Sequence, residues 1–120
     1  MQYMFLIYLD EARFAPLTQK ERDSFGNAML DYDSELRASG HLVSSEPLKA
    51  PSEAITVRKW NGELTTTDGP FMETKEHLSG FCIVKARDLN EALQLASKMP
   101  LATMGSIEVR PIDILERVEL

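Results

Sequence analysis

Two successive strand–helix–strand patterns within 120 residues predict an α+β domain of the ferredoxin-like, split βαβ type. Each pattern begins with an apolar run, continues through a helix with a recognisable start signal, and ends in a further strand. Residues 1–120 are expected to form a single domain, because no linker or low-complexity tract interrupts them. The strands expected in the sheet are also apolar on both faces, which predicts that the chain associates with a second copy.

The first half of the chain is expected to run from strand to helix to strand. Residues 2–9 form an unbroken apolar or aromatic run, typical of a buried strand, and residues 10–17 predict a loop. A capping box that begins at Thr18 predicts the start of a helix, and Gly40 is expected to end it. A second strand is expected near residues 42–45, with its end around Pro47.

The middle of the chain predicts a β-hairpin. Residues 51–52, Pro-Ser, indicate a turn, and residues 54–60 alternate apolar and polar side chains as a half-exposed strand does. Asn61 and Gly62 form a strong hairpin-turn signal, which leads into a strand over residues 63–67.

The second half repeats the plan of the first. A strand is expected over residues 78–86, followed by a helix that Asp88 caps and Pro100 ends. Residues 105–112 predict the last strand. An apolar tail follows it, with Leu115, Val118 and Leu120.

The uncovered face of this sheet predicts a homodimer. Two helices can cover only one face, whereas residues 2–9 and 81–86 are apolar on both faces. The second face would expose a large apolar patch, which soluble monomers avoid. A second copy packed sheet to sheet, as a two-fold dimer, is the simplest cover.

Charge and composition exclude several classes of partner. The net charge of −6 and the absence of a Lys/Arg cluster argue against nucleic acid. The apolar run at residues 2–9 is too short to span a membrane and lacks the basic flank of a signal peptide, so no membrane partner is expected. Cys82 is the one cysteine and cannot form an internal disulfide, which favours a cytoplasmic protein.

The chemically densest stretch is residues 67–76, Thr-Asp-Gly-Pro-Phe-Met-Glu-Thr-Lys-Glu. Asp68 can bond nearby backbone, Gly69 tolerates positive φ, and Pro70 fixes its own φ, so a rigid turn is expected. The turn presents Phe71 and is followed by charged side chains. Composition alone favours a plain connection between strands followed by a solvated charge run.

This stretch also resembles the Asp-Gly-Pro-Phe signature, usually continued as Ala-Glu-Thr-Lys-Glu, of the YCII-related (DGPF-domain) family, with Met72 as the one difference. Residues 1–8 with the following acidic pair resemble the start of the family. Residues 80–81, 86–89, 91–92 and 105–111 resemble its second half. The resemblance spans nearly the whole chain and implies a dimeric α+β barrel, in agreement with the argument from the sheet.

The resemblance also implies candidate chemistry. Some YCII-related proteins are thought to carry a His–Asp dyad with the histidine on the first helix. Met29 stands at that position here, so Asp68 remains alone as the candidate aspartate. A lone carboxylate can still act as a general base if burial raises its pKa.

The expected site is a cleft walled partly by the Asp68–Glu76 loop. Asp68 is the candidate catalytic residue, as general base or orienting carboxylate, and Lys75 and Arg110 would stabilise developing negative charge. The candidate ligand-binding residues are Tyr8, Phe71, Glu73, Lys75, His77 and Arg110. For Arg110 an ion pair with Glu73 or Asp68 is an equally good interpretation. For Tyr8 a core position with one satisfied hydrogen bond is the commoner case, and for His77 a role outside the site is favoured over one in the cleft.

The remaining reactive residue types favour structural roles. His41 and His77 have no metal-ligand spacing, so no metal site is expected. His41 follows Gly40 and is expected to meet the carbonyl groups at the helix end. Cys82 lies mid-strand and is expected to be an inert core residue.

These observations predict a small cytoplasmic homodimer that is an enzyme, or an enzyme-like binder, for a small organic molecule and works without a cofactor. The alternative is a non-catalytic regulatory or interaction module. The family resemblance suggests this second function, because members are often encoded beside extracytoplasmic-function (ECF) sigma factors.

Overall fold

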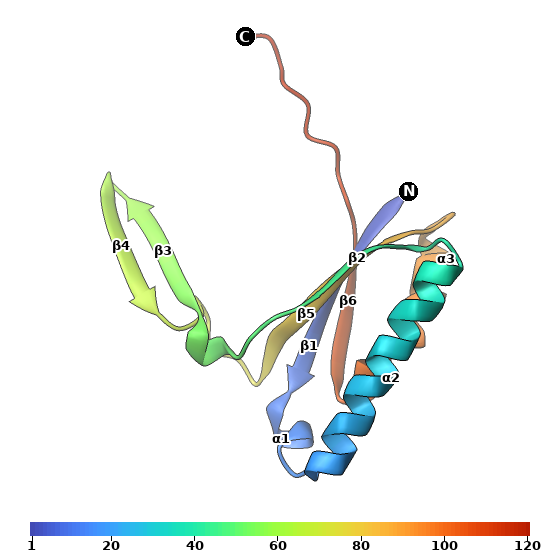
Figure 1. The fold of residues 1–120 in the computed structure, drawn as a ribbon. Coiled ribbons are helices and arrows are strands. Elements are labelled where there is room, and N and C mark those ends of the chain that lie inside the picture. The colour runs from blue at the N-terminus through green and yellow to red at the C-terminus, as the bar shows by residue number, and fades with distance from the viewer.

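A four-stranded antiparallel sheet forms the centre of the molecule in the computed structural model, which describes residues 1–120 (Figure 1). The strand order is β2–β5–β1–β6, and the strands are β1 (Gln2–Asp10), β2 (Leu42–Pro47), β5 (Glu76–Lys85) and β6 (Gly105–Pro111). The connecting helices are α2 (Gln19–Ala38), which follows β1, and α3 (Leu89–Ser97), which follows β5. This order and connectivity are those of the ferredoxin-like split βαβ fold, the subunit fold of dimeric α+β barrels, so the predicted fold class is confirmed.

The core lies between the sheet and the two helices. Alternate residues of β1 and β5 point toward the helices, as the two-residue period of a strand requires. The buried cluster consists of Tyr3, Phe5, Ile7, Tyr32, Leu36, Cys82, Val84, Ala86, Ala92, Ala96 and Met99. The hydroxyl of Tyr32 on α2 donates to the carbonyl of Leu95 at 2.5 Å, which ties the two helices together.

The other side of the sheet, which we call the open face, has no helix over it. The register places on it Met4, Leu6 and Tyr8 of β1, Phe81 and Ile83 of β5, and Ser106, Glu108 and Arg110 of β6. The apolar members are only partly buried in the single chain. Residues 2–9 are therefore buried on one face and half-exposed on the other, which differs from the expectation of a strand buried on both faces.

Local sequence signals position α2 as predicted. Thr18 and Glu21 form the capping box: each side chain accepts from the other residue's backbone N–H, at 3.1 and 3.0 Å. The hydrogen bond from the Thr18 backbone is the main cause that holds the pKa of Glu21 below its usual value, and the bond with the Thr18 side chain adds to it. Gly40, at φ 81°, ends the helix, and the N–H of His41 returns to the carbonyl of Leu36 at 2.9 Å.

Several predicted boundaries need correction. The stretch expected to be a loop at residues 10–17 contains a one-turn helix, α1 (Glu11–Phe14), because the Asp10 side chain accepts from the N–H of Ala12 at 3.1 Å. Strand β5 begins at Glu76, two residues before the expected start. Strand β2, by contrast, ends at Pro47 as predicted. The turn expected at residues 51–52 is part of a short 3₁₀ helix, η1 (Pro51–Glu53), and a second one, η2 (Pro100–Thr103), follows α3.

The side chain of His41 was expected to cap α2, and the structure shows a different contact. Its Nδ1 lies 2.7 Å from the Ser39 hydroxyl, and its Nε2 lies 3.4 Å from a carboxylate oxygen of Glu91. The ring therefore links the end of α2 to the first turn of α3 and meets no carbonyl at the helix end.

The predicted hairpin forms a separate two-stranded sheet, β3 (Ile55–Trp60) and β4 (Glu63–Asp68), which we call the β3–β4 arm. Asn61 and Gly62 turn the chain with φ of 54° and 77°, as a type I′ turn requires. Figure 1 shows the arm standing away from the main sheet, on the opposite side from α2. The residues after β6 run off as an extended tail.

The arm and the tail make the chain more extended than a compact domain. Its radius of gyration is 16.9 Å, whereas a compact chain of this length would have roughly 14 Å. Only 14 of 120 residues are buried, so the single chain leaves much apolar surface uncovered. None of the helices combines the length and the apolar character that crossing a membrane requires.

Candidate functional site

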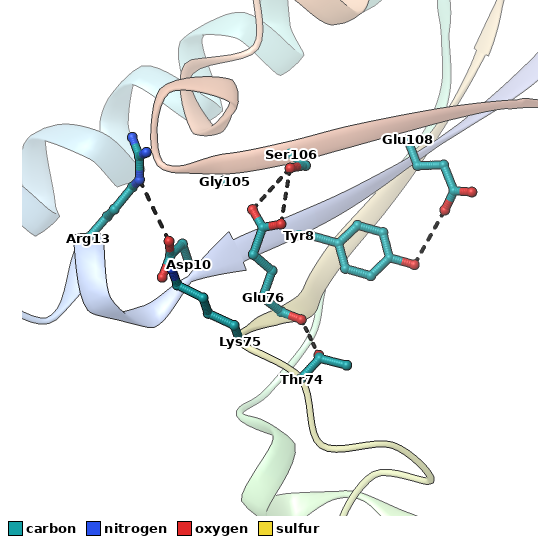
Figure 2. Close-up of a pocket in the computed structure, with 9 residues that line it drawn as sticks. All are labelled: Tyr8, Asp10, Arg13, Thr74, Lys75, Glu76, Gly105, Ser106 and Glu108. Atoms are coloured by element: carbon teal, nitrogen blue, oxygen red, sulfur yellow. Dashed lines mark hydrogen bonds and ion pairs between the residues drawn. The ribbon is translucent and has the colours of Figure 1, made fainter.

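A pocket of about 780 Å³ lies where the end of β1 meets the start of β5 and the start of β6 (Figure 2). We call it the polar pocket. Its lining residues are Tyr8, Asp10, Arg13, Thr74, Lys75, Glu76, Gly105, Ser106 and Glu108. The sheet register assembles this set, because it places Tyr8 opposite Ser106 and Asp10 opposite Glu76.

Two carboxylates in the polar pocket are each held by a hydroxyl group. Ser106 donates its hydroxyl to the carboxylate of Glu76, with oxygen separations of 3.0 and 3.2 Å, and Tyr8 donates to Glu108 at 3.4 Å. The Thr74 hydroxyl donates to the main-chain carbonyl of Glu76 and so fixes the start of β5. Figure 2 shows the Ser106–Glu76 and Tyr8–Glu108 pairs on the same side of the strands. The arrangement presents two hydrogen-bond acceptors of full negative charge beside two hydroxyl groups.

Cations complete the polar pocket. Asp10 is only 8% exposed, and its Oδ2 lies 3.6 Å from Nε of Arg13, so the guanidinium is partly neutralised at the rim. Lys75 lines the same pocket and forms no ion pair within the chain. Its ammonium is therefore available to an anionic group on a bound molecule.

Gly105 allows β6 to approach β1 closely at this pocket. A Cβ atom at position 105 would lie 1.9 Å from the carbonyl oxygen of Tyr8 and 3.0 Å from Cα of Leu9. Both contacts are with backbone, which cannot move aside cheaply. Only glycine fits at this position without separating the two strands that carry Tyr8 and Ser106.

A second pocket, of about 950 Å³, lies beside the first and shares Tyr8 and Thr74 with it. We call it the apolar pocket, because the side chains that give it its character are Tyr8, Leu48, Ile55, Pro70, Phe71, Met72 and Leu78. It lies between the open face and the base of the β3–β4 arm. The turn after β4 is anchored there: Gly69, at φ 97°, donates to the carbonyl of Ala54 at 2.7 Å, and its own carbonyl accepts from Thr56 at 2.8 Å.

The family model of the YCII-related domain matches residues 1–115. The chain belongs to the YCII-related family. It is 33% identical over 122 residues to an uncharacterised protein of Rhizobium meliloti (strain 1021), an alignment that covers all of this chain and 98% of the relative.

A solved structure also resembles this YCII-related chain. It is that of 5-chloro-2-hydroxyhydroquinone dehydrochlorinase (TftG) from Burkholderia phenoliruptrix AC1100, in complex with 2,5-dihydroxybenzoquinone, with a TM-score of 0.55 and 15% identity. The match covers 94% of each chain. At this identity the likeness establishes a shared fold.

The YCII-related fold brings most of the predicted site residues together. Tyr8 lines both pockets, Lys75 lines the polar pocket, and Phe71, Glu73 and His77 line the apolar pocket. Phe71 is largely exposed within the single chain. His77 is half-buried, with Nδ1 4.0 Å from a carboxylate oxygen of Glu11.

Asp68 and Arg110 lie elsewhere. Asp68 is the last residue of β4, opposite Ile55, and is an exposed side chain that lines neither pocket. Arg110 lies opposite Met4 on the open face and is exposed. The expected ion pair of Arg110 with Glu73 or Asp68 is absent within one chain. Met29, at the position of the family's histidine, packs against the core.

Seven residues of the polar pocket were not among the predicted site residues, although two of them, Thr74 and Glu76, belong to the loop that was expected to wall the cleft. The seven are Asp10, Arg13, Thr74, Glu76, Gly105, Ser106 and Glu108. A signal for three of them was present. Residues 106, 108 and 110 are polar at every second position of the last strand, which places three polar groups on one face. Asp10 ends the first apolar run, and a charged residue at a buried strand end is a candidate for a site.

Two groups with strongly raised pKa values lie outside both pockets. Burial, and after it the neighbouring Asp33, raises the pKa of Cys82 to about 12. Burial is also the main cause that raises the pKa of Tyr32 to about 12. Cys82 is fully buried, as expected for a structural cysteine. No three His, Cys, Asp or Glu side chains come close enough together to hold a metal ion.

Proposed function

We propose that this YCII-related protein is a homodimer that binds a small organic molecule where the polar and apolar pockets meet and acts on it by acid–base chemistry. The observation that carries the proposal is the position of Tyr8, which lines both pockets and donates its hydroxyl to Glu108. A molecule that contacts Tyr8 can therefore place an apolar body on one side and polar substituents on the other.

The two pockets define the class of ligand. Phe71, Met72 and Leu78 offer flat and flexible apolar surface for a ring. Lys75 offers a positive charge that no side chain of the chain neutralises, which favours an anionic or acidic oxygen substituent. We therefore assign the ligand to small rings that carry hydroxyl, oxo or carboxylate groups.

The carboxylates supply the chemistry. Glu76, held by Ser106, is the proposed general base for a proton on the substrate, and Lys75 would stabilise the resulting anion. The protonated Glu76 can return this proton to another atom of the substrate, which restores its carboxylate. The Tyr8 hydroxyl, which donates its hydrogen to Glu108, can accept a hydrogen bond from a substrate hydroxyl and so orient it. Every step of such a proton transfer uses side chains of this chain, so the proposal contains no cofactor.

The structural neighbour supports this ligand class without defining the reaction. TftG was solved with 2,5-dihydroxybenzoquinone, a small oxygenated ring. Because the likeness extends only to the fold, the compound is a guide to the first molecules to test.

The second candidate function is a non-catalytic interaction module, with an ECF sigma factor system as the proposed context. The exposed apolar residues of the arm and the tail favour it, among them Trp60, Leu115 and Val118. The two functions depend on different surfaces. An interaction module would require the exposed apolar residues of the arm and the tail and would tolerate substitutions in the polar pocket.

A thermal-shift screen with small hydroxylated and carboxylated rings tests the proposal. We expect one or more compounds to raise the melting temperature of the wild-type protein, because binding to the native state stabilises it. Glu76→Gln and Lys75→Met should remove most of that shift while their melting temperatures without compound stay close to wild type. Glu63→Gln, at the tip of the arm and outside both pockets, is the matched control and should keep the shift. Equal shifts in all variants would exclude the polar pocket as the site.

A further inference from the structure

The two cations and three carboxylates that line the polar pocket are unevenly placed. Figure 2 shows Arg13 and Asp10 together at one end, which we call the Arg13 end, and Glu108 at the other end with Glu76 between them. The side chain of Lys75 is directed toward the Arg13 end. That end therefore holds two cations against one carboxylate, whereas Glu76 and Glu108 make the rest of the pocket negative.

Asp10 holds Arg13 through a contact that uses only one of the three guanidinium nitrogens. Asp10 is only 8% exposed, and its backbone N–H donates to the carbonyl of Met104 at 2.9 Å. One of its carboxylate oxygens accepts from the N–H of Ala12 at 3.1 Å, and the other lies 3.6 Å from Nε of Arg13. A nearly buried and doubly anchored carboxylate thus orients the guanidinium at its Nε side.

The terminal nitrogens of Arg13 form no ion pair within the chain. Their N–H groups form a planar fork, which matches the two oxygens of a carboxylate. Glu11, the acidic residue nearest to Arg13 in sequence apart from Asp10, lies 4.0 Å from His77 and does not line this pocket. The fork therefore remains free for an acceptor on a bound molecule.

The charges also decide which substituent of a ligand fits at which end. Near Glu76 and Glu108 a ring hydroxyl is favoured, because an ionised carboxylate can only accept hydrogen bonds. A carboxylate on the ligand would meet like charge there. At the Arg13 end the same carboxylate would meet the free fork of Arg13 and the ammonium of Lys75.

We infer that Arg13 selects ligands with a carboxylate on the ring, which it binds through its two terminal nitrogens while Asp10 holds its Nε. The ring hydroxyls then lie toward Glu76. This inference rests on the proposed function and narrows its ligand class to hydroxylated ring acids. Arg13 has no role in the proton transfer from substrate to Glu76, so it acts on specificity.

Two compounds that differ in one group test the inference: 2,5-dihydroxybenzoate and the uncharged 2,5-dihydroxybenzamide. In titration calorimetry at pH 7 the wild-type protein should bind the benzoate about tenfold more tightly, because a charge-assisted pair replaces a neutral hydrogen bond. Arg13→Met should lower this preference to less than about twofold by weakening the benzoate alone. Arg37→Met, in the last turn of α2 and outside both pockets, removes the same charge and should keep the preference.

The possible results separate this inference from the proposed function. Equal affinity of the wild-type protein for the two compounds overturns the inference, as does an unchanged preference in Arg13→Met or an equal loss of preference in Arg37→Met. If neither compound binds while the thermal-shift screen yields other ligands, the class of ring acids is wrong and the proposed function stands. A screen without any ligand overturns both.

Discussion

Ser106 and Glu76 join the two strands that flank β1: the serine hydroxyl of β6 donates to the glutamate carboxylate of β5 at 3.0 and 3.2 Å. The contact crosses the end of β1 next to Tyr8. The contact holds the carboxylate that we propose as the general base, and it comes from a residue that is distant in sequence.

Removing this hydroxyl should weaken ligand binding more than folding. In Ser106→Ala the Glu76 carboxylate loses a hydrogen bond of about 1 kcal/mol net, so affinity for a compound found by the thermal-shift screen should fall about fivefold. The side chain is exposed, so the free energy of unfolding should change by less than about 0.5 kcal/mol. Titration calorimetry and urea denaturation measure the two quantities. Ser106→Thr keeps the hydroxyl and should bind nearly as wild type; equal losses in both variants would contradict this role.

Gly105→Ala should strongly destabilise the protein. The new methyl group would meet the backbone of Tyr8 at 1.9 Å, so β6 must move away from β1 or the backbone must distort. We expect a loss of at least about 2 kcal/mol in the free energy of unfolding, measured by urea denaturation.

Gly26→Ala is the matched control for this substitution. A Cβ atom at position 26, within α2, has no neighbour within 4 Å, so the same change should be neutral or stabilise by up to about 1 kcal/mol. Similar effects at the two glycines would show that the close approach of β6 to β1 is not as described.

Cys82 should react slowly with a thiol reagent in the folded protein. Its side chain is fully buried, and burial raises its pKa to about 12, so the reactive thiolate is scarce at neutral pH. Labelling with a soluble maleimide should become fast only in denaturant. Rapid labelling of the native protein would show that the packing of β5 against α2 is looser than described.

The link between Glu91 and its neighbours should make stability depend on pH. The backbone N–H of Arg87, at 3.0 Å, is the main cause that lowers the pKa of Glu91, and the charges of Arg87 and His41 add to it. A lowered folded-state pKa means that the contribution is complete above the unfolded value, 4.5, and is lost as the pH falls through the folded value.

Glu91→Gln should therefore destabilise the protein near pH 7 and less at a pH well below 4.5, where protonation of the wild-type carboxylate progressively removes its charge as well. Urea denaturation at the two values measures the difference. Glu119, in the extended tail, forms no ion pair within the chain, so Glu119→Gln should show no such dependence. A loss of the same size at both values would contradict the electrostatic origin.

Local signals in the sequence were sufficient for most of the fold. The capping box at Thr18, the turn at Asn61-Gly62 and the cap at Asp88 each act within a few residues, and each is present as predicted. The helix α1 was missed because it depends on one side-chain bond from Asp10, for which a loop is an equally good interpretation.

The candidate site was predicted mainly where it is local, apart from Tyr8 on β1 and His77 on β5. The turn at residues 69–75 contributes Phe71, Glu73 and Lys75, and the motif pointed to all three. Ser106 and Glu108 enter through the register of β6 with β1, a long-range pairing that composition does not encode. Asp68 and Arg110 were predicted site residues but lie outside the pockets of one chain, because the site depends on which strand ends the register brings together.

A crystal structure of the protein with a compound from the thermal-shift screen tests the central claim most directly. The claim is that Tyr8 marks the junction of an apolar and a polar pocket that hold one small molecule. We expect density for the compound in contact with Tyr8, with its ring toward Phe71 or Leu78 and an oxygen substituent within hydrogen-bond distance of Glu76, Lys75 or Glu108. A compound bound elsewhere on the molecule, with both pockets holding only solvent, would contradict the account.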